Sequence, residues 1–223
     1  MRQRISKKIL LYFSLLAILG TFNNQYLYDF AFPKIKSIEI LGFEKEKNNL
    51  LNQINDLNLK SLFFLDQKEI MNILDSNHLI ENYFIFKKYP YSLQIKIIKT
   101  KFLANVNNGT KKFYLGSNGK LIISQNEVEE IPFIFGKFEN KNFFSLKKII
   151  DNSSLDYGDI KNLYAYPSGR WDIETKSGIL IKLSKDNIQD ALNLSLNLLN
   201  DEKFRNVNLI DVRQLNQVVT DGK

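Results

Sequence analysis

The first hydrophobic segment of the chain is an uncharged run from Ile9 to Phe22, which follows a basic N-terminus. Extended to Tyr28 through uncharged polar and aromatic residues, the segment contains 20 residues. A helix of that length measures about 30 Å, which is the thickness of the hydrocarbon core of a bilayer. Tyrosines at one end and lysines at the other are typical of the membrane interface. We therefore predict a transmembrane signal anchor over residues 9–28 and a short tail over residues 1–8.

Four basic residues set the predicted orientation of this anchor. They are Arg2, Arg4, Lys7 and Lys8. Because positive charge is retained on the cytoplasmic side of a membrane span, we expect the N-terminus in the cytoplasm and the rest of the chain outside it. Two alternatives stay open at this point. One is a cleaved signal peptide, although Ile18-Leu19-Gly20 is only a weak imitation of an A-x-A site, and the other is a helix of a soluble protein.

Residues 34–101 show the order strand, helix, helix, strand, strand. Ile38 and Ile40 flank a polar residue, as in a half-buried strand, and an apolar stripe at helical spacing follows between residues 50 and 57. Asp66 lies three residues before a glutamate, which is the spacing of a capping box at the start of a second helix. Two further strand patterns flank Pro90, which cannot donate to a ladder and therefore marks a turn.

Residues 102–223 predict a second, mainly antiparallel β domain with flanking helices. The pair Asn118-Gly119 supplies the positive φ of a tight hairpin turn. A helix is expected over residues 188–199, and a strand begins at Leu209. The fold class of the whole chain is therefore α+β.

Composition narrows the possible functions. The chain has 223 residues, no cysteine and one histidine, so disulfides, cysteine nucleophiles and zinc sites built on cysteine or several histidines are excluded. The net charge is +7 and the pI about 9.3. Residues 1–33 hold four basic residues and one acidic residue, which leaves a charge of +4 for the remaining chain. That excess is too mild to require a nucleic-acid partner.

No group of residues forms a catalytic constellation. His78 follows a predicted helix, where a partly charged imidazole is favoured, and neither a nucleophile nor an orienting acid is evident in the sequence. Trp171 lies in an alternating strand, which favours a place in the core. Asp151, Asp156 and Asp159 lack the glycine and the closing glutamate of a calcium loop. We therefore expect no enzyme activity, no cofactor, no metal site and no small-molecule ligand.

Several motifs resemble the FtsQ/DivIB family of bacterial cell-division proteins. In the first folded part they are Ile38-Glu39-Ile40-Leu41-Gly42, Ser61-Leu62-Phe63 and Lys87-Lys88-Tyr89-Pro90-Tyr91-Ser92-Leu93. In the second part they are Pro132 with Gly136, Arg170-Trp171, Gly178, and Asp211 with Arg213. These residues are expected to be structural, the last two in an ion pair or a turn contact. Lys99 and Phe102 depart from the family pattern, which usually has glutamate and proline there.

The resemblance implies a domain organisation and a function. The expected parts are a cytoplasmic tail (1–8), a signal anchor (9–28), a POTRA domain of β-α-α-β-β order (34–101) and a β domain (102–223). The protein would be a non-enzymatic scaffold of the divisome at the septum, single-pass and type II in the bacterial inner membrane, with its folded domains in the periplasm. The implied partners are FtsB- and FtsL-like single-pass division proteins, FtsK and components of the septal peptidoglycan synthase.

The resemblance further implies a partner-binding edge strand at the C-terminus. This strand would comprise Gln214, Leu215, Asn216, Gln217, Val218, Val219 and Thr220. A strand at a sheet edge can pair with an incoming peptide through its main chain. The alternatives are a periplasmic POTRA-containing adaptor for outer-membrane protein assembly and, more weakly, a basic nucleic-acid-binding protein.

Overall fold

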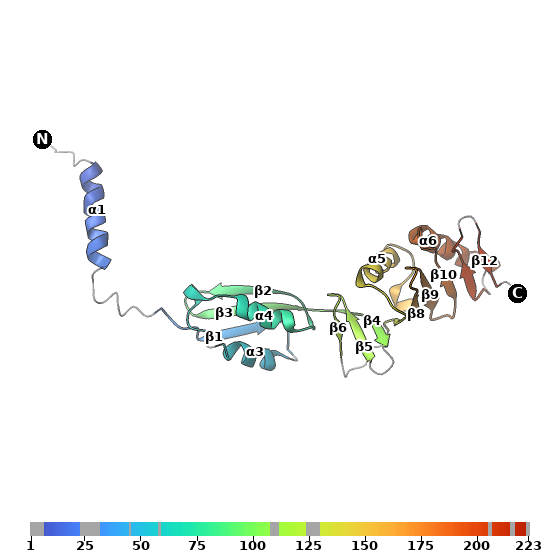
Figure 1. Cartoon of the computed structure of the whole chain (residues 1–223), viewed down its shortest axis with the longest axis horizontal. Helices are drawn as coiled ribbons and strands as arrows, with labels where there is room; N and C mark the ends of the chain where they lie inside the picture. Colours follow the sequence, from blue (N-terminus) through green and yellow to red (C-terminus); the bar gives the residue numbers. More distant parts are fainter. Residues whose placement is uncertain are drawn as a thin grey trace. The chain divides into compact units, whose positions relative to one another are not determined.

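A computed structural model describes most of the chain (Figure 1). The described residues are 7–22, 32–44, 46–57, 59–107, 112–123, 130–204, 207–214 and 217–221. They form two compact units, the first of residues 1–71 and 84–96 and the second of residues 72–83 and 97–223.

The most N-terminal element is helix α1 (Lys7–Phe22), whose described side chains are exposed. The predicted anchor extends six residues further, and residues 23–28 lie outside the described part of the chain. Within the described residues, no helix has both the length and the apolar character needed to cross a membrane. The anchor therefore stays a prediction.

A three-stranded sheet in the strand order β1-β3-β2 follows, and the strands and helices of this part occur along the chain in the predicted order. The elements are β1 (Ser37–Leu41), α3 (Lys47–Asn55), the 3-10 helix η1 (Leu62–Phe64), α4 (Lys68–Ser76), β2 (Ile80–Lys88) and β3 (Ser92–Lys99). β1 runs parallel to β3, so that Ile40 lies opposite Ile95. Both side chains are fully buried, together with Ile54 of α3 and Leu62 of η1. The alternation seen in the sequence thus marks the face of the sheet that packs on apolar side chains.

A second, nine-stranded sheet occupies the C-terminal part of the chain in the order β12-β11-β10-β9-β8-β7-β4-β5-β6. Its strands are β4 (Phe102–Asn107), β5 (Lys112–Gly116), β6 (Leu121–Ile122), β7 (Phe133–Phe135), β8 (Ile160–Ala165), β9 (Trp171–Thr175), β10 (Leu180–Lys182), β11 (Leu209–Asp211) and β12 (Val219–Thr220). The α+β class is confirmed. The sheet is mainly antiparallel, as predicted, but β4 and β7, β7 and β8, and β10 and β11 pair in parallel.

Two of these parallel pairs are joined by helical crossovers. Helix α5 (Asn140–Asp151) connects β7 to β8, and helix α6 (Ile188–Leu199) connects β10 to β11. β8 and β10 each run antiparallel to β9, so both crossovers start from strands of the same direction and step the same way along the sheet. Right-handed crossovers of this kind place both helices over the same face. Figure 1 shows α5 and α6 on one side of these strands.

That helical face contains the core of the second unit. Phe143, Leu146 and Ile150 of α5 are fully buried and belong to one cluster with Leu192 of α6. Trp171 of β9 is also buried, and its ring centroid lies 6.4 Å from that of Phe143. The expected core position of Trp171 is therefore confirmed, and α6 covers the predicted range. Sequence analysis did not assign α5, although Phe143, Leu146 and Ile150 follow helical spacing.

We predict that Phe143→Ala lowers the free energy of unfolding by about 3–5 kcal/mol, because it leaves a cavity beside the buried indole. Urea denaturation followed by the fluorescence of Trp171, the single tryptophan of the chain, measures this change. Phe135→Ala is the matched control: its ring is 42% exposed, and we expect a loss below about 1 kcal/mol. Equal losses for the two variants would contradict the assignment of the core.

Candidate protein-interaction site

The C-terminal edge of the large sheet is the candidate site, and β12 is its last strand. Within the described residues, no strand pairs with the outer side of β12. The strand consists of Val219 and Thr220 alone and is therefore shorter than the seven residues expected from the sequence. Gln214, Gln217 and Val218 lie outside any strand, and residues 215 and 216 lie outside the described chain.

The backbone pattern shows which groups of β12 face outward. The amide of Leu180 donates to the carbonyl of Asn208, and the amide of Val212 donates to Lys182. Because peptide groups alternate in direction along a strand, those of Asp211 point toward β12, where Val219 is its partner. The peptide groups of Val219 therefore face β11. The peptide groups of Thr220 face the free edge, and continued alternation places those of Val218 on the same side.

Asp221 holds the end of β12 beside the start of β11. Its Oδ1 accepts hydrogen bonds from the amides of Leu209, at 2.8 Å, and Asn208, at 2.9 Å. These bonds lower the pKa of the Asp221 carboxyl, and the bond from the Leu209 amide has the largest effect. The contact closes the β11–β12 hairpin on its open side, so the side chain that ends the strand also fixes its register.

Asp211 and Arg213 form the expected ion pair at the other end of the same hairpin. The guanidinium donates to both carboxylate oxygens, with Nη2 2.6 Å from Oδ2 and Nε 2.8 Å from Oδ1, and the Arg213 amide donates to Oδ1 at 3.1 Å. The hydrogen bond from Arg213 is the main cause that lowers the pKa of Asp211. A two-pronged contact of this type fixes the orientation of the arginine and the backbone turn after β11.

The pair belongs to a row of alternating charges on the face opposite the helices. Lys182 of β10 stands opposite Asp172 of β9 on one side and Asp211 of β11 on the other. Arg170 Nε lies 3.1 Å from Asp172 Oδ1, and the guanidinium lies over the ring of Tyr166 at 3.9 Å. Burial, partly offset by these partners, raises the pKa of Asp172. The row thus places side chains of opposite charge next to one another on three neighbouring strands and leads to the edge.

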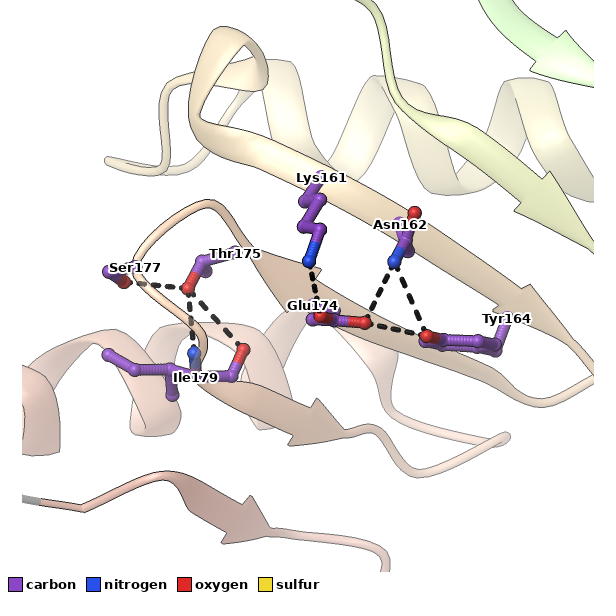
Figure 2. Close-up of polar contacts among 7 residues, drawn as sticks. All are labelled: Lys161, Asn162, Tyr164, Glu174, Thr175, Ser177 and Ile179. Atoms are coloured by element: carbon purple, nitrogen blue, oxygen red, sulfur yellow. Dashed lines mark hydrogen bonds and ion pairs between the residues drawn. The ribbon is translucent and has the colours of Figure 1, made fainter.

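A second polar cluster on this face joins β8 to β9 (Figure 2). Glu174 accepts hydrogen bonds from the Tyr164 hydroxyl at 2.6 Å and from Asn162 Nδ2 at 2.9 Å, and Lys161 Nζ lies 3.4 Å away. The hydrogen bond between Tyr164 and Glu174 lowers the pKa of Glu174 and raises that of Tyr164. All these groups satisfy one another, which indicates a structural cross-link rather than a reactive centre.

A depression of about 540 Å³ adjoins the candidate edge. It is lined by Asp211, Arg213, Gln214, Gln217 and Val219. The lining combines one charged pair, two amides and an apolar side chain. A peptide that pairs with β12 could place a side chain in this depression, which would add specificity to main-chain pairing.

The remaining family-motif residues occupy turns and buried positions. Tyr89 and Pro90 form the β2–β3 turn, Leu93 is buried in β3, and Pro132 is buried just before β7. Gly136 has a φ of 94°, and a Cβ there would lie 2.1 Å from the carbonyl oxygen of Ala165, so only glycine fits. Gly178 lies in the β9–β10 turn with a φ of 90°.

The residues expected to orient the anchor lie at or before the start of α1. Lys7 and Lys8 are its first two residues and are exposed. Arg2 and Arg4 lie outside the described residues. Of the two departures from the family pattern, Lys99 ends β3, and Phe102 opens β4 with its ring centroid 5.1 Å from that of Tyr114.

The only histidine is held in a structural contact. His78 lies in the turn after α4, and its Nδ1 is 3.0 Å from the carbonyl oxygen of Leu121. Asn118 donates to the carbonyl of His78 at 2.9 Å. Across the described ranges, no cluster of three or more acidic or histidine side chains is arranged to hold a metal ion.

Sequence analysis missed three residues that build the candidate site: Asp172, Lys182 and Asp221. Each lies in or next to a short strand, and the alternation of the first two with buried neighbours was visible as Trp171-Asp172-Ile173 and Ile181-Lys182-Leu183. What could not be seen was the register that brings Asp172 and Lys182 together. For Asp221, its position directly after Val218 to Thr220 was the available signal.

Comparison with known proteins agrees with these motifs. The family model described as "Cell division protein FtsQ/DivIB, C-terminal" matches residues 104–213. The chain is 27% identical over 190 residues to the cell division protein FtsQ of Rickettsia bellii, covering 82% of this chain and 70% of that protein. It is 25% identical over 230 residues to the cell division protein DivIB of Clostridium botulinum, covering 92% and 85%.

A solved extracytoplasmic domain of DivIB from Geobacillus stearothermophilus is also similar, at 15% identity and a TM-score of 0.33, covering 43% of this chain and 87% of that one. The sequence matches place the chain in the class of bacterial cell-division proteins. Within that class it belongs to the FtsQ/DivIB family, which confirms the resemblance found in the sequence.

We predict that Asp211→Asn lowers the free energy of unfolding by about 0.5–1.5 kcal/mol at neutral pH, since the charge-assisted bonds to Arg213 are lost. A carboxyl whose pKa is lowered by folding stabilises the fold above its unfolded pKa, and that contribution disappears as the pH falls through the folded value. The difference between parent and variant should therefore shrink at acidic pH. Denaturation series in urea at several pH values measure it.

Asp172→Asn is the control, because the opposite pKa shift predicts the opposite trend. A carboxyl whose pKa is raised by folding loses stability as the pH rises, so the variant should gain relative to the parent between acidic and neutral pH. If both variants followed the same pH dependence, the assignment of a buried, desolvated Asp172 and an arginine-stabilised Asp211 would be wrong.

Proposed function

We propose that the chain is a non-enzymatic scaffold of the bacterial divisome that binds a partner by strand addition to β12. One observation carries this proposal: β12 is the last strand of a nine-stranded sheet and presents its outer side. Main-chain groups of such a strand can pair with an extended peptide in the manner of the sheet itself. Membership of a family of cell-division proteins supports the process in which the scaffold acts.

The proposed domains follow the sequence analysis. Residues 34–101 would be a POTRA domain, which the observed order of β1, α3, α4, β2 and β3 supports. Residues 102–223 would be the partner-binding β domain. Residues 9–28 would anchor the chain in the inner membrane, with the basic residues at positions 2–8 in the cytoplasm and both domains in the periplasm at the septum.

The proposed partners come from family resemblance. They are FtsB- and FtsL-like single-pass division proteins for the edge strand, together with FtsK and components of the septal peptidoglycan synthase. The edge itself suits a partner that offers an extended segment, because β12 contributes main-chain groups, and the depression beside it offers the Asp211–Arg213 pair, two amides and Val219. Such a partner would gain affinity from the backbone and specificity from alternate side chains.

We predict that Val218→Pro and Thr220→Pro each weaken binding of the FtsB-like partner by tenfold or more. Proline removes one amide donor at the free edge and leaves the peptide groups of Val219 toward β11 intact. Affinity is measured by titrating the purified full chain with the partner's periplasmic segment. Thermal unfolding checks that each variant stays folded.

Val219→Ile is the matched control, because it keeps the backbone, the β-branched shape and the apolar character of the side chain at the neighbouring position. We expect its affinity to stay within about threefold of the parent, since its main-chain groups face β11. Folded Val218→Pro and Thr220→Pro variants that bind as tightly as the parent would contradict strand addition at this edge.

Cellular localisation separates the proposed function from the adaptor alternative, which the comparisons do not favour. A functional fluorescent fusion of the full chain should form rings at midcell before constriction. Uniform labelling of the envelope, combined with co-purification of an outer-membrane barrel protein, would contradict the division role.

A further inference from the structure

An exposed aromatic cluster lies at the end of the first sheet where β1 and β3 begin and β2 ends. The ring centroids of Phe32 and Phe63 are 5.0 Å apart, those of Phe32 and Phe64 are 4.8 Å apart, and those of Phe63 and Tyr89 are 5.0 Å apart. The exposed fractions of Phe64 and Tyr89 are 75% and 57%. The cluster therefore presents aromatic surface to its surroundings instead of closing over a core.

Three lysines lie in the segments that lead to these rings. Lys34 pairs with Ser61 in an isolated antiparallel β-bridge next to the cluster. The Nζ of Lys36 lies 5.0 Å from the ring centroid of Tyr91. Together with Lys60 these exposed residues line a pocket of about 430 Å³, whose other walls are mainly apolar. The surface thus combines aromatic rings with amines around a partly apolar hollow.

This combination fits the interface of a bilayer that contains anionic phospholipids. Tyr89 suits the headgroup region, because its ring is apolar and its hydroxyl can stay in water. The phenylalanine rings suit the boundary between the headgroups and the acyl chains. Lysines near such a surface interact with lipid phosphates and can extend their amines toward them while their methylenes stay in apolar contact. A protein partner of neutral or basic surface would not use the three amines.

The chain connectivity favours a lipid surface over other occupants. Phe32 follows the last residue of α1, Phe22, by ten residues. Ten residues span at most about 36 Å, so the cluster cannot move far from the end of that helix. If α1 belongs to the proposed anchor, the membrane is present at high effective concentration, and weak interfacial contacts suffice to hold the cluster there.

We infer that the surface formed by Phe32, Phe63, Phe64, Tyr89, Lys34, Lys36 and Lys60, named here the aromatic-lysine end, docks on an anionic phospholipid bilayer. Docking would hold the first unit against the outer face of the membrane in which the chain is anchored. The inference rests on the proposed anchor and is independent of strand addition at β12, which uses residues of the other unit.

The absence of cysteine allows a direct test. The full-length Phe64→Cys variant is spin-labelled and reconstituted in vesicles of phosphatidylcholine with phosphatidylglycerol, and collision rates with oxygen and with a nickel chelate report the depth of the label. The control is Phe84→Cys, which is 46% exposed and lies on β2 five residues before Tyr89. We expect an oxygen-to-nickel ratio several-fold higher at position 64 than at position 84.

Charge is tested in the same labelled chain. The combined change Lys34→Gln, Lys36→Gln and Lys60→Gln should return the label at position 64 toward the aqueous ratio, and so should vesicles of phosphatidylcholine alone. Because all three lysines are exposed, circular dichroism should show an unchanged fold. An unchanged label depth after both changes would overturn the role of the lysines.

The remaining outcomes separate this inference from the proposed anchor. A chain that floats with the vesicles but carries an aqueous label at position 64 would overturn docking and leave the anchor intact. A chain that does not float would overturn both. A label that becomes buried only as the protein-to-lipid ratio rises would identify a second copy of the chain as the occupant and would also overturn docking on lipid.

Discussion

The handedness of two crossovers is the constraint from which most of the second unit follows. β7, α5 and β8 form one crossover and β10, α6 and β11 form the other, both from strands of the same direction. Right-handed connections therefore place both helices on one face. Apolar side chains of the strands are buried on that face, and the opposite face is left for the charge row, the Glu174 cluster and the rings of Phe133 and Phe135. After the second crossover, the chain adds β12 at the outer edge, beside β11.

The edge that results is short and closely held. A long, flat edge strand would pair with other chains without specificity. Strand β12 has only two residues and charged neighbours, and both features limit such aggregation. Asp221 ties one end of β12 to β11, and the Asp211–Arg213 contact fixes the turn at the other. The edge is thereby preorganised. Binding of an incoming strand would therefore cost less conformational entropy than if β12 had to become ordered on binding.

Sequence patterns predicted the elements whose signal is local. Helix α6 and the order of elements in the first sheet follow from periodicity, and the Asp211–Arg213 contact follows from the spacing of two residues at the end of β11. The segment from Gln214 to Gln217 does not alternate between apolar and polar residues. Among the described residues, the strand expected there comprises only Val219 and Thr220. The row of Asp172, Lys182 and Asp211 depends on the register of three strands far apart in sequence. Such pairing is set by tertiary packing, which no local pattern encodes.

The distribution of basic residues acquires a finer meaning in the folded chain. The sequence alone assigned the N-terminal charges to orientation and treated the remaining +4 as diffuse. Folding brings Lys34, Lys36 and Lys60 to the walls of one pocket beside an aromatic cluster, although Lys60 lies far from the other two along the chain. Elsewhere, Arg213 forms an ion pair with Asp211, and Lys182 stands opposite Asp172 and Asp211 in the charge row. The net charge of residues 34–223 is thus a poor guide to their surface: opposite charges lie side by side on the large sheet, whereas the lysines at the aromatic-lysine end are gathered beside exposed rings.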